Sequence, residues 1–235
     1  MNIIFFYLSF LFMFGSFFGW VLEFFFRRIF HKQWVNPGFL RGPYLPIYGF
    51  GLIILYIITM INLPIQPPFI NITIKILGVG FIMTAIEYLA GLLFIKTMGI
   101  RLWDYSSQTG NINGIICPLF SIIWTIVGTI YVLFVHTQIL KIINILTTNV
   151  YYPFVVGIFL GIFLWDLFST LEISDRIRGF AKNAQMIVRY EDFKIKEKDY
   201  YKINNIRYNF FRPLNTQGTL MDELLIQYRE DNKEK

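Results

Sequence analysis

Apolar stretches of about 20 residues are the feature that most limits how this sequence can fold. Such a stretch crosses the hydrocarbon core of a bilayer as an α-helix, because a helix satisfies its own backbone hydrogen bonds where water is absent. The sequence predicts spanning helices over residues 3–26, 44–62, 76–95, 114–136 and 151–171. We therefore expect an all-α integral membrane protein of about five transmembrane helices.

The charged residues divide the chain into two parts. Of the 15 acidic residues, 11 lie at or after Glu172, and 13 of the 21 basic residues follow it. This distribution predicts a polytopic transmembrane domain over residues 1–172 and a charged tail over residues 173–235. Residues 173–190 mix apolar and basic side chains, which fits either an amphipathic helix at the membrane surface or a simple basic anchor. Residues 191–212 are interpreted as an irregular polar stretch, followed by a short terminal helix.

Lysine and arginine residues in the short loops predict the orientation, since loops rich in them stay on the cytoplasmic side. The predicted inner loops contain Arg27, Arg28, Lys32, Arg41, Lys96 and Arg101, whereas the opposite loops contain only Lys75 and Lys141. We therefore expect the N-terminus outside and the C-terminus inside. The net charge of +6 then indicates contact with anionic headgroups of the inner leaflet, and not with nucleic acid. The abundance of Ile, Phe, Asn and Lys is typical of an AT-rich genome and predicts a bacterial plasma membrane.

Three acidic residues fall inside predicted spans, namely Glu23, Glu87 and Asp166. A charge in hydrocarbon costs at least ~2.5–3.5 kcal/mol, so such side chains usually face protein or water. They could form internal salt bridges that hold the helices together, or a site for a substrate, an ion or a proton. The salt-bridge partners would be Arg27 or Arg28 for Glu23, and Arg41 or Arg101 for Glu87. Both interpretations remain open at this point.

Small and polar residues recur along one face of several predicted helices, a pattern that permits close contact between helices in a membrane. These residues are Gly15 and Gly19 in the first helix, Gly80 and Thr84 in the third, and Ser121, Thr125 and Gly128 in the fourth. We expect these faces to pack against one another.

The first predicted inner loop, residues 36–49, contains three glycines and three prolines, which set specific turns. It leads into the N-terminus of a helix, where free N–H groups and the helix dipole favour an anion. Arg41 adds a planar set of donors suited to phosphate or carboxylate. The loop could therefore bind a phosphate-like headgroup. Alternatively, it is a packed loop in which Arg41 caps an acid of the membrane domain.

The second predicted inner loop contains Arg101, Trp103, Asp104 and Asn113, and it also leads into a helix. Trp103 suits the interfacial belt of a membrane protein. In both halves a helix with an inner-half acid precedes a glycine-containing loop and a second helix. This order predicts a parallel two-helix repeat.

The candidate site residues follow from these observations. The substrate-binding candidates are Glu23, Glu87, Arg41, Arg101 and Asp104, and further polar candidates are Arg27, Trp103, Asn113 and Asp166. No phosphate-binding loop ending in Gly-Lys-Ser/Thr occurs in the sequence, so we do not expect this chain to hydrolyse nucleotides or to be an enzyme. His31 and His136 fall on opposite predicted membrane sides, and we expect neither a metal nor a cofactor.

The sequence resembles the CmpB-like family of type IV ABC-transporter permeases over residues 5–135. The motifs that carry the resemblance are Phe18-Gly19-Trp20 with Glu23, Asn36-x-Gly38-Phe39-Leu40-x-Gly42-Pro43, Pro46-Ile47-Tyr48-Gly49, Glu87-Tyr88, Trp103-Asp104-Tyr105-Ser106 and Asn111-x-Asn113-Gly114. The resemblance implies a permease subunit that works with a separate ATP-binding protein. Since five helices are few for a pore, it also implies a homo-oligomer.

Three functions are compatible with the sequence. The first is a permease-type subunit with an inward-opening polar site, in which Glu23 and Glu87 are opposed by Arg41 and Arg101. The second is a lipid-binding or lipid-modifying membrane protein with an anion site at Arg41. The third is a non-catalytic scaffold that recruits a cytoplasmic partner through the tail.

Overall fold

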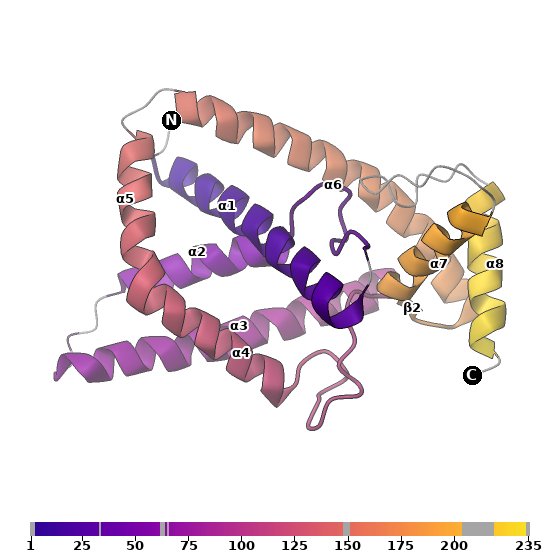
Figure 1. The fold of residues 1–235 in the computed structure, drawn as a ribbon, viewed down its shortest axis with the longest axis horizontal. Helices are drawn as coiled ribbons and strands as arrows, with labels where there is room; N and C mark the ends of the chain where they lie inside the picture. Colours follow the sequence, from indigo (N-terminus) through magenta and orange to yellow (C-terminus); the bar gives the residue numbers. More distant parts are fainter. Residues whose placement is uncertain are drawn as a thin grey trace. The chain divides into compact units, whose positions relative to one another are not determined.

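The computed structural model describes residues 3–32, 34–61, 64, 66–147, 151–203 and 219–233, and Figure 1 traces these elements along the chain. Almost all of them are helical. The elements are α1 (Ile3–Phe26), η1 (Arg27–His31), α2 (Pro46–Met60), α3 (Pro68–Met98), β1 (Ile100–Arg101), α4 (Pro118–Ile130), η2 (Tyr131–Val135), α5 (His136–Thr147), α6 (Tyr151–Ala184), β2 (Val188–Arg189), α7 (Tyr190–Ile203) and α8 (Thr219–Lys233). The two η elements are π-helical turns.

Four helical stretches of the described chain are long and apolar enough to cross a membrane: Ile4–Ile29, Pro68–Met98, Pro118–Leu146 and Tyr151–Ala184. This confirms the coarser prediction of a mostly helical protein with several apolar helices of membrane-spanning length, whereas the predicted count of about five spans stays a prediction. The predicted span over residues 44–62 corresponds to α2, which has only 15 residues. A helix of that length rises about 22 Å, less than the ~30 Å hydrocarbon core. Pro46 occupies the first turn of α2, and its C-cap, Ile61, is extended, so the helix ends before the next prolines.

Several helix boundaries differ from the sequence prediction; the third helix, for example, covers Pro68–Met98 rather than residues 76–95. The fourth helix begins at Pro118 rather than near residue 114, because Cys117 precedes a proline and is extended (φ −151°, ψ 159°). Helix α6 continues to Ala184, beyond the predicted end of its apolar stretch at residue 171. Hydropathy marks where the apolar part of a helix ends, and not where the helix itself ends. Helix α6 stops where Gln185 adopts a positive φ of 52°.

The interpretation of the tail as irregular over residues 191–212 is wrong as far as residue 203. Helix α7 covers Tyr190–Ile203, with Glu191 and Asp192 in its first turn and Lys202 in its last. Acids near the N-terminus and bases near the C-terminus complement the helix dipole. The remainder of that stretch, residues 204–212, lies outside the described residues.

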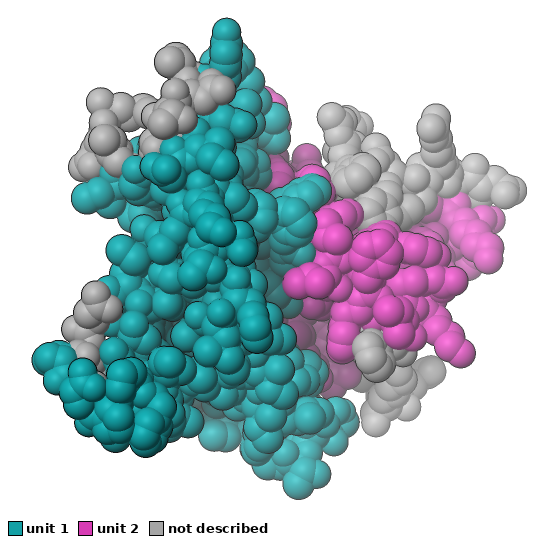
Figure 2. Space-filling view, turned by 60° about the vertical axis from the view of Figure 1, so that its left-hand side comes forward, with its two compact units in different colours: residues 1–19, 45–90, 105–162 teal, residues 20–44, 91–104, 163–235 magenta. Residues whose placement is uncertain are grey.

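The chain forms two compact units, which Figure 2 shows in different colours. Unit 1 comprises Met1–Gly19, Leu45–Ala90 and Tyr105–Ile162, and unit 2 comprises Trp20–Tyr44, Gly91–Asp104 and Phe163–Lys235. The boundaries fall inside α1, α3 and α6, so each of these helices contributes a segment to both units.

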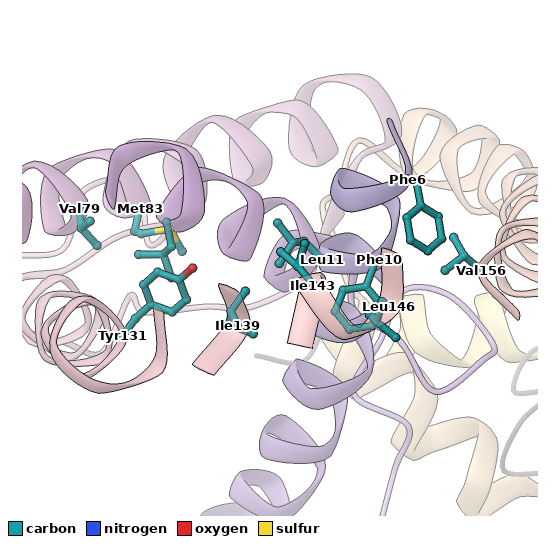
Figure 3. Packing of buried hydrophobic residues seen from close by; sticks show 11 residues of the cluster. Phe6, Phe10, Leu11, Val79, Met83, Tyr131, Ile139, Ile143, Leu146 and Val156 are labelled. Carbon is teal, nitrogen blue, oxygen red and sulfur yellow. The ribbon is translucent and has the colours of Figure 1, made fainter. Parts of the chain in front are cut away.

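The core of unit 1 is formed by apolar side chains from all of its helices, and Figure 3 shows ten of them labelled. The buried members are Phe6, Phe10, Leu11, Leu55, Val79, Met83, Tyr131, Ile139, Ile143, Leu146 and Val156. Glycines permit close helix approach around this core. Gly80 on α3 faces Thr125 on α4, and Gly128 on α4 faces Val79 on α3. The predicted small-residue faces of these two helices therefore pack against each other.

The small-residue face of α1 packs on α2. A Cβ atom at Gly15 would lie 2.8 Å from the Tyr48 carbonyl oxygen, and one at Gly49 would lie 2.7 Å from the Phe12 carbonyl oxygen. The backbone N–H of Leu45 also donates to the Ser16 carbonyl at 2.9 Å. Because both glycines approach backbone, which cannot rotate away, neither position has room for a side chain.

Unit 2 is built around a second apolar cluster, to which α6, α7, α8 and both strands contribute. Its buried members are Ile100, Ile177, Ala181, Val188, Tyr190, Phe193, Leu225 and Tyr228. Strands β1 and β2 pair in parallel, with Ile100 opposite Val188 and Arg101 opposite Arg189. The charged tail therefore contributes to a packed core.

The packing of α1 on α2 is tested by Gly49→Ala, for which we expect a loss of about 1–3 kcal/mol in the free energy of unfolding, because the added methyl group overlaps the α1 backbone. Thermal unfolding in mild detergent measures the effect. Gly161→Ala is the matched control, since a Cβ atom there meets nothing within 4 Å. Equal unfolding temperatures for the two variants would contradict this account of the packing.

Candidate functional site

The loop between η1 and α2 is organised by the buried side chain of Asn36. Its Oδ1 accepts hydrogen bonds from Trp20 Nε1 at 2.9 Å and from the Gly38 N–H at 3.1 Å. Its Nδ2 donates to the Arg41 carbonyl at 2.8 Å. An asparagine that bonds to the backbone two residues on closes a local turn. The side chain thereby fixes the course of residues 36–41.

The Asp166 carboxylate of α6 binds the next part of this loop. Its oxygens accept the backbone N–H groups of Arg41 (3.3 Å) and Gly42 (2.7 Å), the Tyr44 hydroxyl (2.6 Å) and the Thr170 hydroxyl (3.2 Å). Only 6% of the Asp166 surface is exposed. A buried carboxylate needs such donors, because an unpaired charge in this setting is very costly. Burial, together with the Asp166 carboxylate, raises the pKa of Tyr44 above its usual range, so the phenol stays a donor.

The loop therefore binds an anion, but that anion is a side chain of the same protein. Consecutive backbone N–H groups hold an anion, and that anion is Asp166. The alternative, a packed loop bound to a membrane acid, describes the structure better, but the contact uses the Arg41 backbone rather than its guanidinium. Arg41 Nε is buried and has no hydrogen-bond partner among the described residues.

Glu23 and Arg27 form the ion pair that the sequence predicted. Arg27 Nε lies 3.2 Å from Glu23 Oε1, one helical turn away, and Arg27 Nη1 lies 2.6 Å from Glu191 Oε1 on α7. Arg27 is buried, with 8% of its surface exposed. Two carboxylates compensate its charge, which is the arrangement that makes a buried cation tolerable.

Asp104 is held between two arginines. Arg101 Nη1 contacts Asp104 Oδ1 and Arg189 Nη2 contacts Asp104 Oδ2, both at 2.8 Å. The structure thus brings together two predicted site residues, Arg101 and Asp104, and adds a third from the tail. Trp103, between them in sequence, is partly buried in the same unit.

Glu87 lies in unit 1, and only 5% of the residue's surface is exposed. Oε1 accepts a hydrogen bond from the Tyr105 hydroxyl at 3.0 Å, and Oε2 accepts one from Trp124 Nε1 at 3.1 Å. These donors are neutral and come from the loop before α4 and from α4 itself. The next residue along α3, Tyr88, accepts a hydrogen bond from Asn113 Nδ2 at 3.0 Å. Asn113 has a positive φ of 55°, a conformation that asparagine tolerates better than most residues.

An aromatic side chain of α2 completes the surroundings of Glu87. Tyr48 lies with its ring centroid 5.7 Å from that of Trp124. On its other side Tyr48 fills the space at Gly19 of α1, where a Cβ atom would overlap the ring. Contacts from Glu87 to Trp124, from Trp124 to Tyr48 and from Tyr48 to Gly19 therefore link α3, α4, α2 and α1 in turn.

The structure distributes the candidate residues over three groups in unit 2 and one in unit 1. The groups in unit 2 are Glu23 with Arg27, Arg101 with Asp104, and the loop around Arg41 with Asp166. The group in unit 1 is Glu87, with Asn113 bound to its neighbour. No group of three or more His, Cys, Asp or Glu side chains that could hold a metal ion occurs in the described part of the chain.

Sequence reasoning missed the tail residues that complete these groups. Glu191 binds Arg27, Arg189 binds Asp104, and Lys194 donates to the carbonyls of Asn36 (3.0 Å) and Gly38. In the sequence all three belong to a run of charges that looks like a solvated face. The available signal is the helical spacing of the apolar residues Tyr190, Phe193 and Tyr200 within the run, which indicates a helix with one buried side.

Comparison with known proteins places most of the chain in one family. Residues 10–171 match the CmpB family of ABC transporters, described as "Putative ABC-transporter type IV". The match extends through the first part of α6, beyond the region 5–135 that showed the resemblance. No curated protein and no solved structure matches the chain.

Asp166→Asn tests the binding of the loop to α6. An amide has one acceptor oxygen where the carboxylate has two, so some of the four donors lose their partner, at a cost of about 1–3 kcal/mol. We expect faster amide hydrogen exchange at Arg41 and Gly42, measured by mass spectrometry. Asp175→Asn, an exposed acid on the same helix, is the control and should leave the exchange unchanged. Unchanged exchange in Asp166→Asn would show that other contacts fix the loop.

Proposed function

We propose that this chain, which belongs to the type IV ABC-transporter family matched over residues 10–171, is a permease-type membrane subunit that works with a separate ATP-binding protein. Four apolar helices long enough to cross a membrane support this proposal. The sequence contains no phosphate-binding loop, so the energy of ATP hydrolysis would have to come from another subunit. With the orientation expected from the lysines and arginines, the tail would lie on the side where that subunit acts.

The observation that carries the proposal is the buried carboxylate of Glu87. It lies within the apolar stretch Pro68–Met98. An ionisable side chain at such a position costs free energy and usually marks a functional site. Its hydrogen bonds to Tyr105 and Trp124 connect it to α4, which is also a candidate span. We infer that Glu87 contacts the transported substrate. Glu23 and Asp104 already form ion pairs within unit 2, which favours a structural role for these two acids in stabilising that unit.

Glu87→Gln is expected to lower transport-linked activity at least tenfold while the protein still elutes as a folded species. The amide keeps the size of the side chain and removes its charge. Growth of a host strain that depends on the protein, or ATP hydrolysis by the purified complex, measures the activity. Tyr88→Phe is the matched control, because it removes one hydroxyl at the next position and leaves the acid in place. A fully active Glu87→Gln protein would exclude Glu87 from the site.

The partner is tested by purifying the tagged protein in mild detergent from its own host and identifying the co-purifying proteins by mass spectrometry. We expect a nucleotide-binding protein in stoichiometric amount, with ATPase activity in the preparation. The same tag on an unrelated polytopic protein of the host controls for carry-over. A preparation with no nucleotide-binding protein would count against the permease proposal.

A second candidate function rests on Arg41. Its Nε is buried without a hydrogen-bond partner among the described residues, and a buried donor of this kind usually has one. An anionic phospholipid headgroup would supply acceptors for the guanidinium. One phospholipid enriched over the bulk membrane in the same preparation, and lost in Arg41→Ala but not in the exposed Arg28→Ala, would support a lipid-binding function. No enriched lipid would exclude it.

A further inference from the structure

The segment Val188–Lys198 of the tail contacts both loops of unit 2 that join apolar helices. The first loop lies between η1 and α2 and is called the α1–α2 loop. The second begins at Gly99, after α3, and is called the α3–α4 loop. We propose that this segment is a releasable clamp. It fixes the spacing of the two loops while α7 is docked, and it releases the α1–α2 loop when Lys194 takes up a proton.

One arm of the clamp holds the α3–α4 loop. The Val188 N–H donates to the Gly99 carbonyl at 2.9 Å, and Val188 lies opposite Ile100 in the parallel pair of strands. Arg189 adds the ion pair with Asp104. Val188 and Ile100 are both fully buried, so this arm combines backbone bonding with apolar burial.

The other arm, α7, holds the α1–α2 loop through its backbone carbonyls. Lys194 donates to Asn36 and Gly38, and Tyr190 Oη donates to the Phe39 carbonyl at 3.2 Å. At the start of α7, Glu191 pairs with Arg27 at 2.6 Å. These contacts connect a tail helix with a loop more than 150 residues earlier in the chain.

Lys194 is the weak point of this arm, because an amine has been taken out of water. Only 1% of the surface of Lys194 is exposed. Burial, and then the charge of Arg27, lower the pKa of Lys194 to about 7, an effect that Glu197 and Glu191 offset only in part. The Tyr190 ring, 4.5 Å from Nζ, also faces the amine. A neutral amine still has the two hydrogens that the two carbonyls require.

The direction of the pH effect follows from these two protonation states. When α7 is released, Lys194 regains its ordinary pKa of 10.5, so between about pH 7 and 10.5 the released form carries one more proton than the docked form. A rise in pH within this window therefore favours docking, by up to about tenfold per pH unit. Below about pH 7 both forms are protonated and the clamp is at its weakest.

The spacing of the loops can be measured with spin labels at Lys32→Cys and Lys96→Cys, two exposed positions, in a Cys117→Ala background. Pulsed EPR on the full-length protein in lipid nanodiscs at pH 7 and pH 9 reports the distance distribution. We expect one narrow distance for the docked form and a broad distribution for the released form. The ratio of the broad to the narrow component should fall by more than tenfold from pH 7 to pH 9. Neither ATP nor a substrate is needed, so the result is independent of whether the chain is a permease.

Variants of Lys194 separate the clamp from a general effect of pH. Lys194→Met should abolish the pH dependence, and Lys194→Arg, which stays charged, should show the broad component at both pH values. Lys202→Met is the matched control on the same helix, since Lys202 is exposed and lies outside the clamp segment, and it should behave as the wild type. A wild-type distribution that does not change with pH, or a pH dependence retained in Lys194→Met, would overturn the assignment of Lys194.

The clamp itself is tested by a charge reversal. Glu191→Lys should broaden the distance distribution at both pH values, because it replaces the ion pair to Arg27 by repulsion. Asp192→Lys makes the same change of charge at the next, exposed position and should leave the distribution narrow. Should Glu191→Lys fail to elute as a folded protein, Arg189→Gln replaces it, since Arg189 is largely exposed. A narrow distribution in whichever of these two variants is folded would show that the membrane helices alone set the spacing.

Discussion

The Asp166 carboxylate is the interaction on which the geometry of unit 2 depends. It brings a charge from α6 to two consecutive backbone N–H groups and a tyrosine hydroxyl of a loop far away in sequence. Without an anion, those donors would be buried and unsatisfied, and without the donors, the buried carboxylate would lose the hydrogen bonds that compensate its removal from water. Each side therefore makes the other tolerable. This contact places the Arg41–Tyr44 part of the loop, directly after the part that the Asn36 side chain fixes and whose carbonyls Lys194 uses.

The composition and the apolar stretches were sufficient to predict an all-α membrane protein and, with the motifs, its family. Local patterns also predicted the Glu23–Arg27 pair and the contact of α3 with α4 through Gly80 and Gly128. What they could not predict is pairing between distant segments. No repeat spacing in the sequence relates Asp166 to Arg41, and nothing in the sequence near Glu191 indicates that its partner is Arg27. Such contacts depend on the tertiary fold, which a pattern of hydropathy and charge does not encode.

The charged tail illustrates the same difficulty in another way. A high density of Lys, Glu and Asp usually means solvation, and the tail was interpreted accordingly. In the structure the apolar side chains between those charges form the core of unit 2, and several of the charges face inward onto carbonyls or opposite charges. Amphipathic long side chains can be buried when their polar ends find partners. The charges of the tail are thus part of the packing and not only its surface.

The separation of Arg41 and Asp166 along the chain has a consequence for biogenesis. The two residues that meet are 125 positions apart, so the ribosome completes the loop long before it makes the acid that binds it. Three apolar helical segments, α2, α3 and the stretch from α4 to α5, are synthesised in that interval. During insertion the loop N–H groups would have to bond to water or to a chaperone. The loop can take its final form only after α6 emerges, which makes α6 the segment that completes unit 2.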